Sequence, residues 1–141
     1  MQVPLRPPPA PPTRDDLQAA QARFWSRVAR RYARDPIADP AGYEATLRRV
    51  SALLHPEHSV LEIGCGTGTS ALRLAVGTRR LLATDLSAEM IAIAREKLAA
   101  WPVPGLRFEV GAAESGSPTG ERHDVVLAFN VLHVVPDLDR V

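Results

Sequence analysis

Three glycines lie within five residues directly behind the apolar run Val60–Ile63, at Gly64, Gly66 and Gly68. Glycine adds no side-chain packing and loses more conformational freedom on folding than other residues, so this spacing indicates a backbone that must turn sharply or approach a ligand closely. Between a strand and a helix, such a loop exposes its N–H groups, and the helix that follows presents its positive end. The stretch therefore predicts a loop that binds a small molecule with an anionic group.

The residues beside the glycines separate two classes of ligand. The dinucleotide fingerprint G-x-G-x-x-G needs a glycine in its sixth position, and this chain has Thr69 there. Glu62 stands two residues before the first glycine, where a carboxylate would repel a pyrophosphate but suits a cationic ligand. A nicotinamide-dependent oxidoreductase is therefore the less favoured class.

The pattern E-x-G-x-G-x-G over Glu62–Gly68 resembles the cofactor loop of class I S-adenosylmethionine-dependent methyltransferases. Five more segments strengthen the resemblance, which extends from Phe24 to Val141: two N-terminal helical segments, the helix after the second strand, the turn after the third strand and the end of the fourth strand. They read FWSRVARRYARDP with AGYEATLRRVSALL, DLSAEMIAIAREKL, VGAAES and NVLHVVPD. The resemblance implies the cofactor S-adenosyl-L-methionine, which has a positive sulfonium and an anionic methionine carboxylate.

The resemblance also implies which residues contact the cofactor. Asp85 ends the second expected strand, where a carboxylate can accept hydrogen bonds from both ribose hydroxyls. The implied cofactor-binding residues are Glu62, Gly64, Cys65, Gly66, Gly68, Asp85, Leu86, Ala112, Ala113 and Asn130.

One position departs from the family pattern in the turn that contacts adenine. Relatives often carry an acidic or amide side chain directly after the glycine of this turn, and this chain has Ala112 there. Adenine recognition then falls to backbone groups of residues 111–113 or to Glu114. A lost hydrogen bond of this kind costs about 0.5–1.5 kcal/mol, which leaves the cofactor class unchanged.

Methyl transfer from a sulfonium is an in-line displacement on an activated donor, so the protein mainly supplies alignment and dry surroundings. A base is needed only where the acceptor must lose a proton, and His133, near the end of the fourth expected strand, is the candidate catalytic residue. Asn130 is not followed by Pro-Pro-aromatic, so the pattern of nucleic-acid amino methylation is missing. A small-molecule methyl acceptor is therefore predicted.

The composition is that of an ordinary globular protein. The 141 residues are 45% apolar and 23% charged with a net charge of +1, which fits about one domain and favours neither nucleic acid nor an anionic membrane as a partner. Cys65 is the single cysteine, which predicts no internal disulfide and no metal centre, and favours a cytoplasmic location. Apolar runs stay well below the roughly 20 residues of a membrane span.

The chain divides into three expected parts. Residues 1–12 contain six prolines and predict a disordered tail. Residues 13–57 predict an N-terminal cap of two helices, at about 13–34 and 39–55. Residues 58–141 alternate strands with helices, which predicts a Rossmann-like α/β fold with a doubly wound parallel sheet. The expected strands are 59–64, 80–86, 106–112 and 124–132, and the expected helices are 70–76, 88–100 and one that opens at 136–137.

Three patterns predict packing. The first helix is expected to bury a face at three- and four-residue spacing, formed by Leu17, Ala20, Phe24, Val28 and Tyr32. The second helix is expected to bury Tyr43, Leu47, Val50 and Leu54. Residues 125–129 are apolar without alternation, which predicts a central strand buried on both faces.

Methyltransferases of this class continue with further strands that carry much of the acceptor pocket. The chain is therefore expected to hold the N-terminal half of the sheet, either as a fragment or as a short protein that self-associates through its open fourth-strand edge. The expected function is methyl transfer from S-adenosylmethionine. The main alternative is a module that binds the cofactor without turnover.

Overall fold

The computed structural model describes residues 10–141, so most of the predicted tail of residues 1–12 lies outside the described residues. Helices α1 (Arg14–Tyr32) and α2 (Pro40–Leu53) come first along the chain. They are followed by β1 (Ser59–Ile63), α3 (Thr69–Leu74), β2 (Arg80–Asp85), α4 (Ala88–Ala100), β3 (Leu106–Val110) and β4 (Val125–Ala128). Short 3-10 turns are found at Ala75–Gly77, Ala113–Ser115, Leu132–Val134 and Leu138–Arg140.

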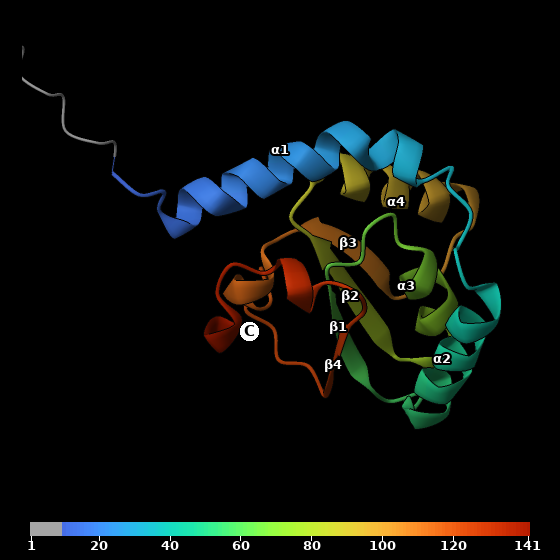
Figure 1. Ribbon diagram of the computed structural model, residues 1–141. Helices are drawn as coiled ribbons and strands as arrows, with labels where there is room; N and C mark the ends of the chain where they lie inside the picture. Colours follow the sequence, from blue (N-terminus) through green and yellow to red (C-terminus); the bar gives the residue numbers. More distant parts are fainter. Residues whose placement is uncertain (1–9) are drawn as a thin grey trace, which may run out of the picture.

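The strands of the described residues form one parallel sheet in the order β3-β2-β1-β4 (Figure 1). The chain winds outward from β1 through β2 to β3 and then returns to the other side of β1 with β4. A reversal of this kind leaves a crevice at the carboxyl ends of the strands on either side of it, where ligands bind in doubly wound sheets. The predicted Rossmann-like α/β fold is confirmed.

One face of the sheet carries the main core. Val60, Leu81 and Phe108 pack there with the buried sides of α2, α3 and α4. All five residues of β1 are buried, as expected for a strand with neighbours on both sides. The predicted inward face of α2 is confirmed, since Leu47 is buried in this core and the other predicted residues, Tyr43, Val50 and Leu54, pack against it.

Helix α1 packs along α4, but not through the predicted face. Ala29 is its buried residue, and it contacts Met90 and Ile93 of α4. The prediction was wrong because the two helices meet at a small residue of α1, Ala29. The larger side chains of Met90 and Ile93 pack against it. Several large residues of the predicted face are exposed instead, namely Leu17, Phe24 and Tyr32.

Polar contacts fix the position of α1 over the start of α4. The hydroxyl oxygens of Ser26 and Ser87 lie 2.8 Å apart, and Ser87 is the N-cap of α4. Arg30 forms ion pairs with Glu89 at 2.6 Å and with Glu96 at 2.9 Å. Ion pairs this exposed contribute little free energy, so the packing of α1 on α4 carries most of the stabilisation.

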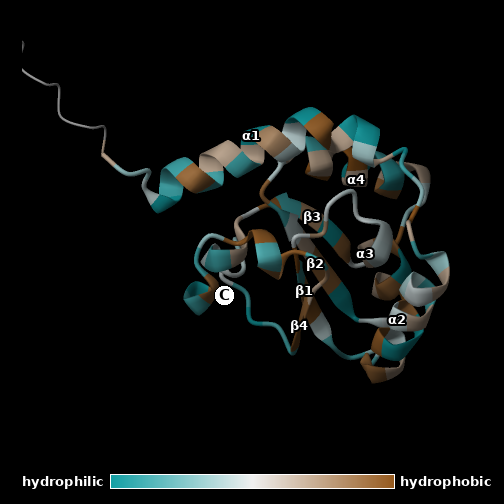
Figure 2. Ribbon diagram, viewed as in Figure 1, coloured by the Kyte–Doolittle hydropathy of each residue, from teal (hydrophilic) through white to brown (hydrophobic). Residues whose placement is uncertain are grey.

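Strand β4 is an edge strand in the part of the chain that the structure describes, with β1 as its neighbour. Val125 and Leu127 pack on the main core, whereas the Val126 side chain is 59% exposed. Figure 2 shows this strand in hydrophobic colours. Within residues 10–141, the prediction that β4 is a central strand buried on both faces is wrong. No helix or strand of these residues covers the Val126 side chain.

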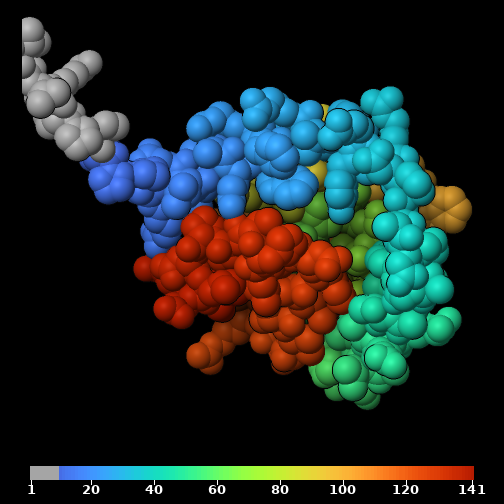
Figure 3. All heavy atoms as spheres, in the orientation of Figure 1, coloured from blue at the N-terminus to red at the C-terminus, as the bar shows by residue number. Residues whose placement is uncertain are grey.

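After β4 the chain folds back across the carboxyl ends of the strands. Asn130, with a φ of +51°, turns the chain, so β4 ends earlier than the predicted strand 124–132. The following residues 131–136, here called the return segment, lead to the last 3-10 turn, which replaces the helix predicted to open at 136–137. Figure 3 shows the C-terminal residues, in orange and red, against the blue atoms of α1.

Candidate functional site

The glycines of the loop after β1 have φ values of +66° at Gly64, +55° at Gly66 and +77° at Gly68, a region that side chains disfavour. A Cβ atom at Gly64 would lie 2.2 Å from Cγ2 of Val131, and one at Gly68 would lie 2.6 Å from Cζ of Phe108. At Gly66 the nearest atom would be 3.9 Å away. Gly64 and Gly68 are thus required both because a Cβ has no room there and because of their backbone conformation. Gly66 is required by its conformation alone, and the space beside its backbone stays accessible.

Asp85 lies beside this loop because β1 and β2 pair with Ile63 opposite Thr84. Its Oδ2 accepts a hydrogen bond from the Gly66 N–H at 2.9 Å, and its Oδ1 accepts one from the Ser87 N–H at 2.9 Å. Burial raises the pKa of Asp85, and these two N–H groups counteract the rise. Each carboxylate oxygen has a further lone pair, so the group can still accept hydrogen bonds from ligand hydroxyls.

Glu62 ends in a buried carboxyl group below the loop. The residue is 2% exposed, and its Oε2 has no hydrogen-bond partner. Burial raises the pKa of Glu62 to about 8. Burial of a polar atom without a partner costs free energy, and a nearby positive charge would favour the ionised carboxylate. The residue is therefore suited to a cationic ligand.

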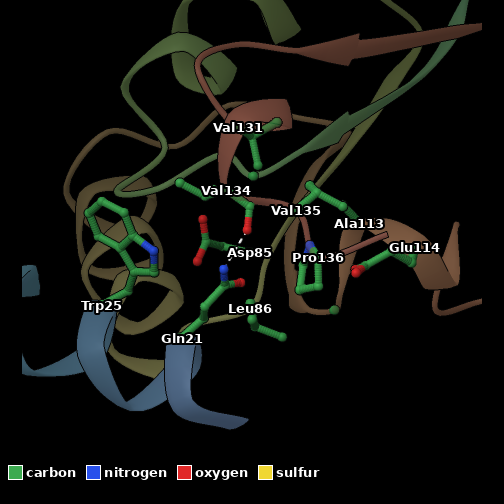
Figure 4. A pocket seen from close by; sticks show the side chains of 12 residues that line it. Gln21, Trp25, Asp85, Leu86, Ala113, Glu114, Val131, Val134, Val135 and Pro136 are labelled. Carbon is green, nitrogen blue, oxygen red and sulfur yellow. Dashed lines mark hydrogen bonds between the residues drawn. The ribbon is translucent and has the colours of Figure 1, made fainter. Parts of the chain in front are cut away.

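A small pocket opens beside the loop, between α1, the strand ends and the return segment (Figure 4). Its volume is about 60 Å³. It is lined by Gln21, Trp25, Gly64, Asp85, Leu86, Gly111, Ala113, Glu114, Val131, Val134, Val135 and Pro136. Four predicted cofactor-binding residues thus meet in one place, namely Gly64, Asp85, Leu86 and Ala113.

Helix α1 contributes two pocket residues that are not among the predicted cofactor-binding residues, Gln21 and Trp25. Gln21 donates a hydrogen bond from its side chain to the carbonyl oxygen of Val134, drawn as a dashed line in Figure 4. The two residues are four positions apart on one helix and so share a face. The predicted inward face of α1 was built from apolar residues. A pattern that also counted polar residues at helical spacing would have placed Gln21 beside Trp25.

The turn after β3 carries a carboxyl side chain at Glu114, two residues after Ala112. Glu114 is buried, lines the pocket and has no hydrogen-bond partner for its Oε1. Figure 4 shows its carboxyl group directed toward Pro136 of the return segment. Ala112 does not line the pocket, whereas Gly111 and Ala113 do. The turn thus offers one buried acceptor, and it is two residues later than the family pattern places it.

Other predicted site residues lie apart from the pocket lining. Cys65 is buried in the main core, and burial raises the pKa of its thiol well above the ordinary value, which opposes a role as nucleophile. Asn130 and His133 are exposed and do not line the pocket. The structure therefore does not bring His133 to the place where the predicted cofactor residues meet. Glu62, Gly66 and Gly68 shape or support the loop from outside the pocket lining.

The chemistry of these residues fits S-adenosylmethionine. An open backbone loop, a carboxylate beside it and the unpartnered oxygens of Glu62 and Glu114 provide acceptors and a negative charge for a cationic, hydroxyl-bearing ligand. The pocket volume of about 60 Å³ is below the roughly 300–1,000 Å³ of small-molecule sites. Val131 of the return segment packs against Gly64 at one side of this volume, so a larger pocket requires the return segment to move.

The described residues also bear on two other types of site. Among residues 10–141, no three His, Cys, Asp or Glu side chains are grouped so that they could hold a metal ion. No helix in this part of the chain combines the length and apolar character that a membrane crossing requires.

A family model for a methyltransferase domain matches residues 60–141, more than half of the chain. The chain therefore belongs to the class I S-adenosylmethionine-dependent methyltransferases, as its fold and its glycine-rich loop predict. The cofactor of this family is S-adenosyl-L-methionine, and the expectation of this cofactor is confirmed.

Two relatives and one solved structure indicate how broad the similarity is. The chain is 35% identical over 101 residues to the malonyl-[acyl-carrier protein] O-methyltransferase of Anoxybacillus flavithermus, which covers 70% of this chain and 38% of that protein. It is 34% identical over 84 residues to the trans-aconitate 2-methyltransferase of Variovorax paradoxus, covering 58% and 30%. The structure of DhpI in complex with S-adenosylhomocysteine matches with a TM-score of 0.63 and 29% identity, covering 88% of this chain and 58% of that one. The chain thus spans well under half the length of these two curated relatives.

Proposed function

We propose that this chain binds S-adenosyl-L-methionine at the loop of residues 64–68 and transfers its methyl group to a small molecule. The observation that carries the proposal is the contact of the Asp85 carboxylate with the Gly66 N–H at 2.9 Å, which joins the second strand end to the loop. In this assignment Asp85 accepts hydrogen bonds from the ribose hydroxyls, and Glu62 faces the positive charge of the ligand. Glu114 and the backbone of residues 111–113 contact the adenine.

The bound cofactor supplies an activated methyl group, so the residues of this chain orient it and exclude water. Trp25 and the valines of the return segment, Val131, Val134 and Val135, provide the apolar surroundings of the pocket. The two carboxyl groups in the pocket lining, Asp85 and Glu114, are assigned to the ribose and the adenine, which leaves neither as a base for the acceptor. We therefore propose His133 as a base only in a conformation in which the return segment has opened.

A small-molecule acceptor is supported by the relatives. The names of the two curated relatives specify a malonyl group on acyl-carrier protein and trans-aconitate, which are both derivatives of small carboxylic acids. The net charge of +1 gives the chain no electrostatic preference for nucleic acid. We propose a small organic acid or a related compound as the acceptor class.

A cofactor-binding module without turnover is the second candidate. The small pocket volume of about 60 Å³ favours it, because a volume of this size has no room for an acceptor beside the cofactor. In this case the chain would bind the cofactor and its demethylated product but release no methylated compound.

One pair of measurements tests the proposal and separates the two candidates. Calorimetric titration of the 141-residue chain with S-adenosylhomocysteine measures binding, with NADH as the control ligand. Incubation with S-adenosylmethionine carrying a labelled methyl group and a panel of small organic acids measures transfer. Binding with transfer supports the enzyme, and binding without transfer supports the module. Binding of NADH but not of S-adenosylhomocysteine would refute both.

A further inference from the structure

Lys97 makes a contact with the glycine-rich loop that the proposed function does not use. The residue lies in the last turn of α4, and its Nζ donates to the hydroxyl oxygens of Thr67 at 2.8 Å and Thr69 at 3.1 Å. Thr67 is buried inside the loop, and Thr69 is the first residue of α3. One ammonium group thus bridges the two residues on either side of Gly68.

Gly68 is the point at which the loop needs support. It has a φ of +77° and is the N-cap of α3, but it provides no side-chain hydrogen bond to the helix. Ala94, one turn before Lys97 on α4, and Phe108 of β3 fill the space beside it. Helix α4 therefore holds the loop in two ways, through a close apolar contact at Gly68 and through polar contacts on both sides of it.

The residue type at position 97 is an exception in this chain. Of its 17 lysines and arginines, 16 are arginine, and Lys97 is the single lysine. The ion pairs among residues 10–141 all use arginine, whereas the recorded partners of the Lys97 ammonium are two neutral hydroxyls. An ammonium is compact and has three donors that can point in different directions, while a guanidinium is a rigid plane suited to carboxylates. Partial burial also lowers the pKa of Lys97.

We infer that Lys97 is a positioning residue, which fixes the conformation of the glycine-rich loop through the hydroxyls of Thr67 and Thr69. The inference rests on the proposed cofactor site at this loop. Lys97, Thr67 and Thr69 do not line the pocket, so the effect on the ligand passes through the loop backbone. Loss of the bridge leaves Gly66 and its hydrogen bond to Asp85 less restrained, and cofactor binding weakens.

Calorimetric titration with S-adenosylhomocysteine tests the inference in a double-mutant cycle. Thr67→Val is expected to weaken binding about tenfold, which is the effect of one charge-assisted hydrogen bond, and Lys97→Met, which removes both bonds, at least tenfold. The double variant is expected to bind about as weakly as Lys97→Met, because that change already removes the hydrogen bond to Thr67. Thr67→Ser keeps the hydroxyl and is expected to retain wild-type affinity. This control shows that a loss of affinity in Thr67→Val comes from the missing hydroxyl and not from poor folding.

Arg95→Met is the matched control for Lys97→Met. Arg95 lies two residues earlier on α4 and donates to the Phe108 carbonyl oxygen and to Glu109, away from the loop. This variant is expected to bind within about twofold of wild type. Equal affinity of wild type and Lys97→Met, or a weakening by Arg95→Met as large as that by Lys97→Met, would overturn the inference.

A spectroscopic measurement separates failure of this inference from failure of the proposed function. Because Lys97 is the single lysine, protein labelled with ¹³C-lysine gives one set of side-chain signals. Thr67→Val is expected to shift the ¹³Cε signal with or without ligand, and an unchanged signal would refute the contact. If the signal shifts but the wild-type chain does not bind S-adenosylhomocysteine, the contact stands and the proposed function fails.

Discussion

The Asp85 carboxylate and the Gly66 backbone N–H form a hydrogen bond of 2.9 Å that connects the carboxyl end of β2 to the loop after β1. The same carboxylate accepts from the Ser87 N–H at the start of α4. Asp85 thus shapes the loop and the helix start, and it also faces the pocket. A substitution of Asp85 therefore changes both the shape of the loop and the group that faces the pocket.

Asp85→Ala is expected to weaken binding of S-adenosylhomocysteine at least tenfold, because it removes a charged acceptor for the ribose hydroxyls and the partner of Gly66. Calorimetric titration checks the affinity. Asp124→Ala is the control, since Asp124 accepts from the Ser59 N–H at the opposite end of β1. Unchanged affinity in Asp85→Ala would remove Asp85 from the site.

Glu62→Gln is expected to stabilise the protein at alkaline pH and to weaken cofactor binding. The folded pKa of Glu62, about 8, is above its ordinary value of 4.5, so the folded state holds this proton more tightly than the unfolded chain. The stabilisation from this proton is complete below pH 4.5 and is lost as the pH rises through about 8, with an upper bound of about 5 kcal/mol at 1.36 kcal/mol per pKa unit.

Thermal melts of wild type and Glu62→Gln between pH 5 and pH 9 measure this effect. The melting temperature of wild type is expected to fall relative to that of the variant across this range, because the neutral amide does not ionise. If the two melting temperatures instead changed in parallel with pH, the prediction would be wrong, and the Glu62 carboxyl group would have a charge partner in the folded protein. Calorimetry on the same samples measures the loss of affinity.

Glu114→Ala is expected to weaken binding of S-adenosylhomocysteine about tenfold, because Glu114 is the buried acceptor beside the adenine turn. S-inosylhomocysteine, which has a keto oxygen in place of the adenine amino group, is expected to bind wild type and variant equally. Glu109→Ala, an exposed carboxylate on β3, is the control for charge. An equal loss for both ligands would show that Glu114 does not recognise the amino group.

Gly68→Ala is expected to destabilise the protein by more than about 1 kcal/mol, because its Cβ would lie 2.6 Å from Phe108 in a backbone conformation that alanine disfavours. Gly77→Ala is the matched control, since a Cβ there meets no atom within 4 Å. Chemical unfolding of the two variants compares their stabilities. Equal stabilities would contradict the close packing of the loop on β3.

Val126→Lys is expected to reduce self-association, because Val126 is an exposed apolar residue on the edge strand β4. Light scattering coupled to size-exclusion chromatography measures the mass as a function of concentration. Leu53→Lys places the same charge on α2, at a residue that is 78% exposed and away from the sheet edge. A wild-type chain that stays monomeric at high concentration would contradict the prediction.

The sequence predicted the parts of the site that follow from strand order. Glycines behind one strand and a carboxylate behind the next must meet if the two strands are parallel neighbours, and Gly64 and Asp85 do line the same pocket. The α4 helix has the predicted bounds, 88–100, because Ser87 caps it and its apolar residues repeat at helical spacing.

The sequence did not predict what depends on packing between distant segments. The inward face of α1 was missed because its buried residue is Ala29, which carries little hydrophobic signal. The contact of Gln21 with the return segment joins residues 113 positions apart, and no local pattern encodes it. The apolar composition of β4 predicts full burial, which the described neighbours of the strand do not provide.

The bond between Gln21 and Val134 also bears on the speed of binding. A ligand that enters between the two segments that carry these residues must first break this bond, and the rate of opening then limits its uptake. The same barrier delays escape once the two segments have closed again. Arrival time and residence time would then share one cause, the separation of α1 from the residues after β4.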